Sequence, residues 1–365
     1  MVQLPPLYRV YAMLRREPNH HCPLFTLIII RAATKNHKRR LCLGILHEPC
    51  SVYFLVEPIT FEPIYMTRVW GGRTLEEVYG RELPDAQPYG ESWEISDRIG
   101  EQSVITEGPL AGTTLHDLWT QQREEIFGAG LNGERFPLLI KILDARDDLS
   151  IQVHPPAEVA PKLGGDPKTE MWYIADAAPG AKLYLGLKDG VTKEAFEASI
   201  ADGTVDQLVH AVEPEAGQSI FIPSGRLHAI GAGLLIYEIQ QNSDTTYRVF
   251  DWNRVGLDGN PRELHVTESM ECIDFADCEP GMDVPDGHTL ASCDYFVVDQ
   301  LEVPEGAALA NPDSEHFSIV TVVDGQLRGS DGRSFEPGDF VLLPRGADQL
   351  EATAATVVLQ TTIPE

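Results

Sequence analysis

The sequence predicts a mainly β fold with a few short helices, built as two jelly-roll barrels of which only the first binds a metal. Residues 217–225 (GQSIFIPSG) are echoed by residues 338–346 (GDFVLLPRG): each runs from a glycine turn through an apolar strand to a Pro-x-Gly turn. From residue 217 onward, short strands and Gly/Pro turns follow one another, and residues 317–325 supply a further hairpin. Paired strands of this kind are typical of jelly rolls.

The same echo predicts how the two barrels, which we expect to be cupin-like, differ. His228 in the first copy aligns with Gln349 in the second, and the second copy has no Gln-x-His or His-x-His pair nearby. We therefore expect a catalytic cupin-like domain at 56–258 and a second, metal-free cupin-like domain at 259–365. The second would cover the first barrel, contribute a wall of its cleft or pair subunits.

The chain before residue 217 mixes strands with helices. Thr113 or Thr114 can cap a helix that Gly128 ends, and the apolar run before Lys141 is typical of a buried strand. The expected elements are a start of the fold at 59–63, a turn at 70–72, strands at 90–96 and 136–143, and helices at 113–127, 192–200 and 205–209.

The first 55 residues differ in charge from the rest. They contain eight Lys or Arg against two Glu, whereas the whole chain has a net charge of −28. A secretory signal, a regulatory tail and a start assigned upstream of the true one are three explanations. No A-x-A site follows the apolar stretch 24–30, which disfavours a signal. We expect residues 1–55 to be a disordered or misassigned-start extension.

The acidic balance of the chain restricts its partners. Its 56 Asp and Glu against 28 Lys and Arg argue against nucleic acid and anionic membranes, and an anionic substrate would need a local basic pocket. Six cysteines without CxxC spacing favour reduced thiols and a cytoplasmic protein. No apolar run is long enough to span a bilayer. Monomer and homodimer both stay open.

Gln152 and His154 form one half of a possible metal site. On a strand, residues two apart project from the same face, about 7 Å from each other. Glu170 and His228 each lie beside an apolar, strand-like run, so that four ligands from three strands can converge. The remaining histidines outside the opening segment have no further ligand-type residues at strand spacing beside them. They are expected to be structural: His116, His210, His265, His288 and His316.

Four motifs occur in order along the chain. They are FPLLIKILDARDDLSIQVHP at 136–155, DPKTEMWYI at 166–174, FIPSGRLHAI at 221–230 and YEIQQNSDTTYRVFDWNR at 237–254, and WGG and GESWEIS precede them. Together they resemble the bacterial type I mannose-6-phosphate isomerases of the cupin superfamily. The similarity runs from about residue 59 to the end of the chain.

The resemblance implies an enzyme that interconverts mannose 6-phosphate and fructose 6-phosphate through a cis-enediol. Arg248 matches the active-site arginine of the family, whose guanidinium suits stabilising an enediolate rather than removing a proton. Lys168 and Asp244 match positions proposed for proton transfer. One Zn²⁺ per chain would be bound by Gln152, His154, Glu170 and His228.

A hexose 6-phosphate needs cations within the acidic chain. We expect Ser150, Lys141 and Lys168 to bind the substrate phosphate. Lys141 is the firmer candidate, because it interrupts an apolar strand where an unpaired charge would be costly. Further candidates are Arg226 and Arg254 for the phosphate and Glu94 behind the metal ligands.

Two alternatives stay open at this point. The chain could be a metal-dependent cupin enzyme of another class, such as an iron dioxygenase, although TYRVFDW at 245–251 would then have no evident role. It could also be a non-catalytic cupin that binds a sugar phosphate. Intact metal ligands together with Arg248 favour the isomerase.

Overall fold

The computed structural model describes residues 57–364, and in this part the chain is mainly β with a few short helices, as predicted. The expectation for residues 1–55 lies outside the described residues. Within the described part, no helix combines the length and the apolarity needed to cross a membrane.

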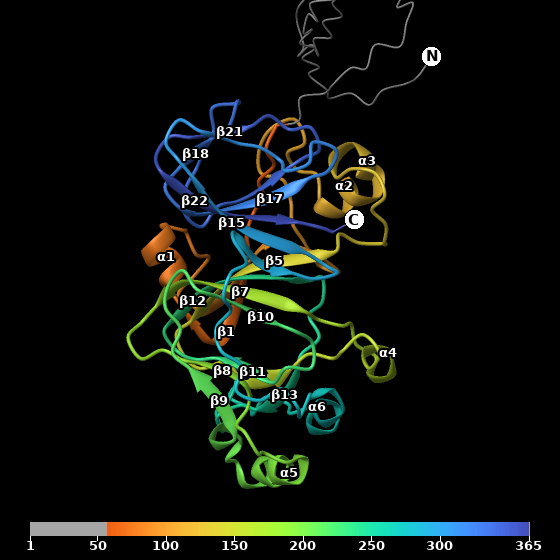
Figure 1. The fold of residues 1–365 in the computed structure, drawn as a ribbon, viewed down its shortest axis with the longest axis vertical. Coiled ribbons are helices and arrows are strands. Elements are labelled where there is room, and N and C mark those ends of the chain that lie inside the picture. The colour runs from red at the N-terminus through yellow and green to blue at the C-terminus, as the bar shows by residue number, and fades with distance from the viewer. Residues whose placement is uncertain (1–56, 365) are drawn as a thin grey trace, which may run out of the picture.

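Two antiparallel sheets form the first half, which is the lower part of Figure 1. The six-stranded sheet has the order β1 (Ile64–Gly72), β2 (Tyr89–Ile95), β5 (Leu138–Ala145), β12 (Leu234–Gln241), β7 (Glu170–Ala177) and β10 (Ser219–Ile222). The five-stranded sheet has the order β13 (Tyr247–Phe250), β6 (Ile151–Val153), β11 (His228–Ile230), β8 (Leu183–Leu187) and β9 (Val209–Val212).

Two further antiparallel sheets form the second half, in the upper part of Figure 1. One has the order β14 (Thr289–Ser292), β15 (Val297–Val303), β22 (Thr356–Thr362), β17 (Ser318–Asp324) and β20 (Phe340–Leu343). The other has the order β16 (Ala308–Leu309), β21 (Leu350–Ala352), β18 (Leu327–Arg328) and β19 (Ser334–Phe335). A small hairpin of β3 (Asp97–Arg98) and β4 (Glu101–Gln102) forms a separate two-stranded sheet.

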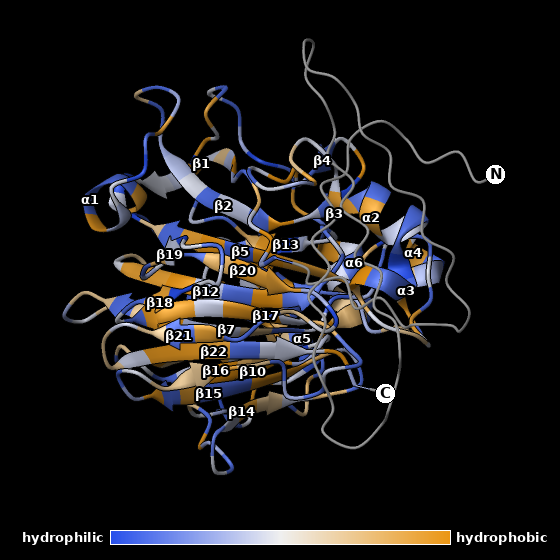
Figure 2. Cartoon of the chain, turned by 90° about the horizontal axis from the view of Figure 1, so that it is seen from above, coloured by the Kyte–Doolittle hydropathy of each residue, from blue (hydrophilic) through white to orange (hydrophobic). Residues whose placement is uncertain are grey.

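The helices are short and lie around the sheets. They are α1 (Thr74–Tyr79), α2 (Leu115–Gln121), α3 (Arg123–Ile126), α4 (Ala160–Leu163), α5 (Lys193–Asp202) and α6 (Val266–Cys272), with a 3₁₀ turn at Val205–Gln207. Figure 2 shows hydrophobic colour concentrated on the strands in the middle of the molecule.

Two predicted helices differ from the structure. The one expected at 205–209 is a 3₁₀ turn at Val205–Gln207, and strand β9 already begins at Val209. The sequence suggested a single helix at 113–127, but α2 and α3 are separate, because Gln122 leaves helical geometry with φ −134°. The predicted cap is present: the Thr114 side chain accepts a hydrogen bond of 3.0 Å from the Asp117 N–H.

The internal echo is visible in the backbone. Gly217 and Gly338 both have φ of 88°, and each turns the chain into an edge strand, β10 and β20. Only glycine adopts this left-handed conformation without strain. The second glycine also meets the other half of the molecule: Arg81 donates a hydrogen bond of 2.7 Å to its carbonyl.

Alternation along β5 and β12 divides the core in two. Ile140 and Ile142 face a core shared with Leu342 and Leu359 of the second half, whereas Leu143 faces a core between the two sheets of the first half. The residues at odd positions of β5 therefore point into the space between the first two sheets. Lys141 is one of them, and Glu238 of β12 is its direct partner in the strand register.

Candidate metal centre and substrate cavity

Three neighbouring strands of the five-stranded sheet bring polar residues together. Gln152 of β6 lies opposite His228 of β11 on one side and opposite Arg248 of β13 on the other. His154 follows β6 directly, and Glu170 begins β7 in the facing sheet. The two sheets thus enclose a polar site from both sides.

His154, Glu170 and His228 form a buried cluster. Their potential ligand atoms all lie within 4.8 Å of one another. The Nε2 atoms of His154 and His228 lie 3.5 Å and 3.6 Å from the two carboxylate oxygens of Glu170. Two imidazoles and a carboxylate gathered around one point are a donor set typical of divalent transition metals.

Backbone carbonyls orient both imidazoles. Nδ1 of His154 lies 2.9 Å from the carbonyl of Thr245, and Nδ1 of His228 lies 2.9 Å from that of Arg226. A carbonyl can only accept, so each Nδ1 carries the proton and each Nε2 presents a lone pair to the cluster. Burial, with the neighbouring His154, lowers the pKa of His228 to about 3, which keeps its ring neutral.

The cluster has buried atoms that lack partners. Nε2 of His154 and Oε1 of Glu170 are buried and make no hydrogen bond within the described structure. Lone pairs left in this state are costly unless a cation occupies the space between them. The Gln152 amide nitrogen lies 3.4 Å from His228 Nε2, and its oxygen accepts a hydrogen bond of 3.2 Å from Ser150. A half-turn of this amide would present its oxygen to the same point. The residues therefore fit a bound metal ion.

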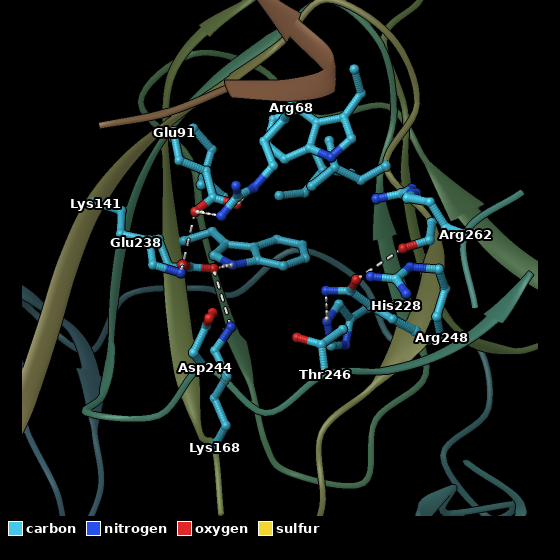
Figure 3. Close-up of a pocket in the computed structure, with 17 residues that line it drawn as sticks. Arg68, Glu91, Lys141, Lys168, His228, Glu238, Asp244, Thr246, Arg248 and Arg262 are labelled. Atoms are coloured by element: carbon cyan, nitrogen blue, oxygen red, sulfur yellow. Dashed lines mark hydrogen bonds and ion pairs between the residues drawn. The ribbon is translucent and has the colours of Figure 1, made fainter. Parts of the chain in front are cut away.

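A cavity of about 390 Å³ opens beside the cluster (Figure 3). This volume is within the range of small-molecule sites. Most of the charged and polar residues that line it are labelled in Figure 3: Arg68, Glu91, Lys141, Lys168, His228, Glu238, Asp244, Thr246, Arg248 and Arg262. Ser150, Gln152 and Trp172 also line it.

Alternating charges form a continuous chain along one side of the cavity. Arg68 donates to both oxygens of Glu91 at 2.8 Å and 3.1 Å, and Lys141 lies 3.9 Å from Glu91. Lys141 Nζ also lies 3.1 Å from Glu238, and Lys168 lies 3.9 Å from the same carboxylate. Each buried charge on this side therefore has an opposite charge beside it.

The last link of this chain reaches the cluster. Lys168 Nζ lies 2.7 Å from Oε2 of Glu170. Although burial opposes it, the neighbouring Glu170 and Glu238 raise the pKa of Lys168. Burial alone would raise the pKa of Glu170, but the Lys168 ammonium beside it holds that pKa well below its usual range. Glu170 is therefore ionised at neutral pH, as a metal ligand must be.

Arginines gather on the other side. Arg248 donates a hydrogen bond of 2.9 Å to the carbonyl of Glu263, and its Nε is buried without a partner in the described structure. Arg262 and Arg254 share one carboxylate, that of Asp251. Burial and the nearby Arg262 lower the pKa of Arg248. Positive charge thus exceeds negative charge locally.

Comparison with known proteins places the chain in a family. Residues 59–179 match the model of the phosphomannose isomerase type I catalytic domain. Mannose-6-phosphate isomerase ManA of Bacillus subtilis is 38% identical over 322 residues, which is 83% of this chain and 98% of the relative. The chain belongs to the type I mannose-6-phosphate isomerases. A mannose-6-phosphate isomerase of Streptococcus mutans is 34% identical over 80% of this chain and 93% of its own.

A solved structure from the family has the same fold. The crystal structure of the mannose 6-phosphate isomerase from Bacillus subtilis superposes with a TM-score of 0.76 and 31% sequence identity, covering 84% of this chain and 100% of the other.

The residues that the family resemblance singled out lie at one place. Of these, Lys141, Ser150, Gln152, Lys168, His228, Asp244 and Arg248 line the cavity. His154 and Glu170 complete the cluster at its inner end. Arg226 and Arg254 do not line it: Arg226 is paired with Asp277 at 2.8 Å, and Arg254 with Asp251 at 3.0 Å. Glu94 is paired instead with Arg81.

Four charged residues that line the cavity were not expected from the sequence: Arg68, Glu91, Glu238 and Arg262. Glu238 carried a usable signal, because it interrupts an apolar strand just as Lys141 does. Arg262 lies in a polar stretch of the sequence, GNPREL at 259–264, and carried none. Within residues 57–364, the five histidines expected to be structural lie outside the metal-type cluster.

Proposed function

We propose that this chain is a zinc-dependent aldose-ketose isomerase that interconverts mannose 6-phosphate and fructose 6-phosphate through a cis-enediol intermediate. The main support is the buried His154, Glu170 and His228 cluster, which opens onto a cavity lined by five Lys or Arg residues. That arrangement suits a small anionic sugar that must also reach a Lewis acid. Its relatives in the family carry the name of the same activity.

The ligands of one Zn²⁺ would be Gln152, His154, Glu170 and His228. The lone pairs of both Nε2 atoms and the ionised Glu170 fit that role. When bound, the metal would polarise the sugar carbonyl and make the neighbouring C–H more acidic.

Arg248 is the residue we assign to stabilising the negative charge that develops on the enediolate oxygens. It lines the cavity directly beside Gln152 in the strand register, and within the described residues its side chain donates to the Glu263 carbonyl rather than to a carboxylate. A guanidinium stays protonated and donates several hydrogen bonds, which suits charge stabilisation rather than proton removal.

Lys168 and Asp244 are the candidates for moving the proton between C2 and C1. Both line the cavity, and Figure 3 draws them next to each other. The raised pKa of Lys168 makes it a proton donor rather than a base in this state, so that Asp244 would accept the proton from C2. Ser150 and Lys141 would bind the substrate from the walls of the cavity.

We also propose that the sheet pairs are two cupin-like jelly rolls, at 56–258 and 259–365, with metal bound only in the first. Gln349 in place of His228 supports this assignment. Among the described residues after 258, no three His, Cys, Asp or Glu side chains gather as a metal-type cluster. The described cysteines, Cys272, Cys278 and Cys293, are free thiols, which suits a cytoplasmic protein.

A coupled assay on the purified full chain tests the function. Formation of fructose 6-phosphate from mannose 6-phosphate is followed before chelation, after chelation and after zinc is restored. We expect activity to disappear with the metal and to return with zinc. If the metal is bound and no conversion occurs, the isomerase assignment fails, and a non-catalytic sugar-phosphate-binding protein takes its place.

A further inference from the structure

The two sides of the cavity differ in how fully their positive charges are neutralised. On one side, Arg68, Lys141 and Lys168 each have a carboxylate within 3.1 Å: Glu91, Glu238 and Glu170 respectively. These carboxylates are buried and cannot move away without leaving a cation unpaired. A phosphate dianion placed on this side would meet three acids as well as three bases.

The opposite side has uncompensated positive charge. Figure 3 shows Arg248 and Arg262 across the cavity from Glu91, Lys141 and Glu238. Arg262 shares the carboxylate of Asp251 with Arg254, which also lies 3.8 Å from the exposed Asp147, and Arg248 donates only to a backbone carbonyl. An anion bound here would gain attraction without displacing a buried carboxylate.

Asp251 fixes the direction of Arg262. Its carboxylate, which is buried, accepts from Nε of Arg262 at 2.7 Å and also from Nη2. Among the described residues, no protein acceptor is within hydrogen-bonding distance of the remaining Nη1. The guanidinium is therefore held along one edge, and its other edge is left for a ligand in the cavity that Arg262 lines.

We propose that Arg262 recognises the 6-phosphate group of the substrate, from the side of the cavity opposite Lys141 and Lys168. This inference rests on the isomerase function proposed above and deepens it. It makes Arg262 a determinant of specificity for phosphorylated sugars, beside Arg248. It also replaces our sequence-based expectation that the lysines bind the phosphate, because the structure pairs both lysines with carboxylates.

Arg254 offers a matched control. It is also an arginine, it binds the same carboxylate at 3.0 Å, and it does not line the cavity. Arg254→Gln therefore removes the same charge beside Asp251 without removing a group that faces the ligand. Arg262→Lys keeps the charge but loses the flat, two-pronged donor.

Binding of inorganic phosphate, measured by isothermal titration calorimetry on the full chain as purified, is the first test. Metal content and thermal midpoint are determined for each variant. We expect Arg262→Gln to raise the dissociation constant about 10- to 100-fold, the loss typical of one charge-assisted hydrogen-bonding group. Arg262→Lys should fall in between, and Arg254→Gln should stay within about twofold of the wild type.

Kinetics with mannose 6-phosphate is the second test. A residue that holds the phosphate equally in ground state and transition state raises KM and leaves kcat nearly unchanged. We expect this pattern for Arg262→Gln. A fall in kcat at unchanged phosphate affinity would overturn the proposal, as would equal losses in Arg262→Gln and Arg254→Gln.

The outcomes separate this inference from the function itself. A wild type that isomerises mannose 6-phosphate while Arg262→Gln binds phosphate normally keeps the function and rejects the role of Arg262. A wild type without isomerase activity whose phosphate affinity still depends on Arg262 rejects the function and keeps the phosphate subsite. Failure of the wild type to bind phosphate at all contradicts the subsite.

Discussion

The state of two imidazole rings determines what the centre can bind. His154 and His228 each donate a hydrogen bond of 2.9 Å from Nδ1 to a backbone carbonyl. This leaves the lone pairs of both Nε2 atoms pointing at Glu170. Without a cation, these lone pairs and a carboxylate face one another in a buried space. The arrangement costs free energy that binding of a metal ion recovers.

The first prediction concerns these ligands. His154→Ala and Glu170→Ala should each lose bound metal and activity together, because either change leaves too few donors. Metal per chain is measured by atomic emission on the purified variants. His288→Ala, whose side chain is 64% exposed and outside the cluster, serves as the control. Full metal content in His154→Ala would contradict the assignment.

Arg248 should separate metal binding from turnover. Arg248→Ala keeps the cluster residues intact, so we expect its metal content to match the wild type. Its kcat should fall by about 10²- to 10³-fold, the usual cost of one group that stabilises developing charge. Near-normal kcat would reject the catalytic role assigned to Arg248.

Glu91 should make stability depend on pH in a defined range. Burial alone would raise its pKa, but Lys141 and Arg68 lower the pKa of Glu91 to about 2 from its ordinary value of 4.5. A folded pKa below the unfolded one means that the stabilisation is complete above about pH 4.5 and is lost as pH falls toward 2. The difference corresponds to roughly 3 kcal/mol at neutral pH.

Glu91→Gln should therefore lower the free energy of unfolding by roughly 3 kcal/mol at pH 7, and by much less near pH 2. Urea denaturation at several pH values measures this. Glu76→Gln is the control, because the Glu76 side chain is 50% exposed and its pair with Arg73 is worth under about 1 kcal/mol. A loss from Glu91→Gln that does not change with pH would show that the carboxylate is not the source of the effect.

At the scale of elements, β1 and β2 need glycines where they approach each other. A Cβ on Gly71 would overlap backbone atoms of Gly90, and the carboxylate of Asp144 lies 2.6 Å from where a Cβ on Gly72 would be. Residues 70–72, which the sequence predicted to be a turn, are instead the last residues of β1, and their two glycines are a requirement of packing. They lead from β1 into α1, and Arg68 and Trp70 of the same strand line the cavity.

Gly71→Ala should destabilise the protein by about 3 kcal/mol, because the clash is with backbone that cannot rotate away. Gly281→Ala is a suitable control, since a Cβ at Gly281 meets nothing within 4 Å and its φ is not left-handed. Thermal unfolding of the two variants checks the difference. Equal midpoints would mean that β1 and β2 can move apart at little cost.

The sequence predicted the strands and helices better than it predicted which charged residues pair with one another. The strand around Lys141 and the edge strand after Gly217 follow from apolar runs and turn residues, and the structure contains both. That Lys141 needed a partner was also foreseeable. Its partners Glu91 and Glu238 were not, because the order of β2, β5 and β12 in the sheet brings them together from positions far apart in the chain.

The site followed the same rule. Gln152 and His154 were recognisable by spacing within one strand, and motif resemblance added Glu170 and His228. Arg262 was not recognisable, because its orientation depends on Asp251, a contact across a loop that leaves no periodic pattern in the sequence. The break of the predicted helix at Gln122 is likewise a tertiary effect, since the residues on both sides favour helix.

At the scale of the whole molecule, one hydrophobic core joins the two halves. Tyr237 of β12 packs edge-to-face on Phe340 of β20, with ring centroids 5.5 Å apart. Leu342 belongs to this shared core, whereas Leu343 faces the core between the two sheets of the second half. Both leucines are fully buried. The halves should therefore unfold together.

Tryptophan fluorescence can test this coupling, because all five tryptophans precede residue 258. Leu343→Ala, which lies in the core of the second half, should lower the midpoint of the tryptophan-detected transition, with a loss of about 2–5 kcal/mol. Leu342→Ala should do the same. Suppose that the tryptophan-detected midpoint of Leu343→Ala equals that of the wild type, while circular dichroism detects earlier unfolding of the variant. The halves would then unfold independently.

Among the described residues, those that line the cavity all lie between Arg68 and Arg262, and strands β14 to β22 contribute none. The second copy of the echo can therefore accumulate substitutions that adjust the temperature range of the protein while the reacting groups stay untouched. Substitutions that adapt the protein to heat or cold would then lie in one half of the chain, and substitutions that adapt it to a new sugar in the other.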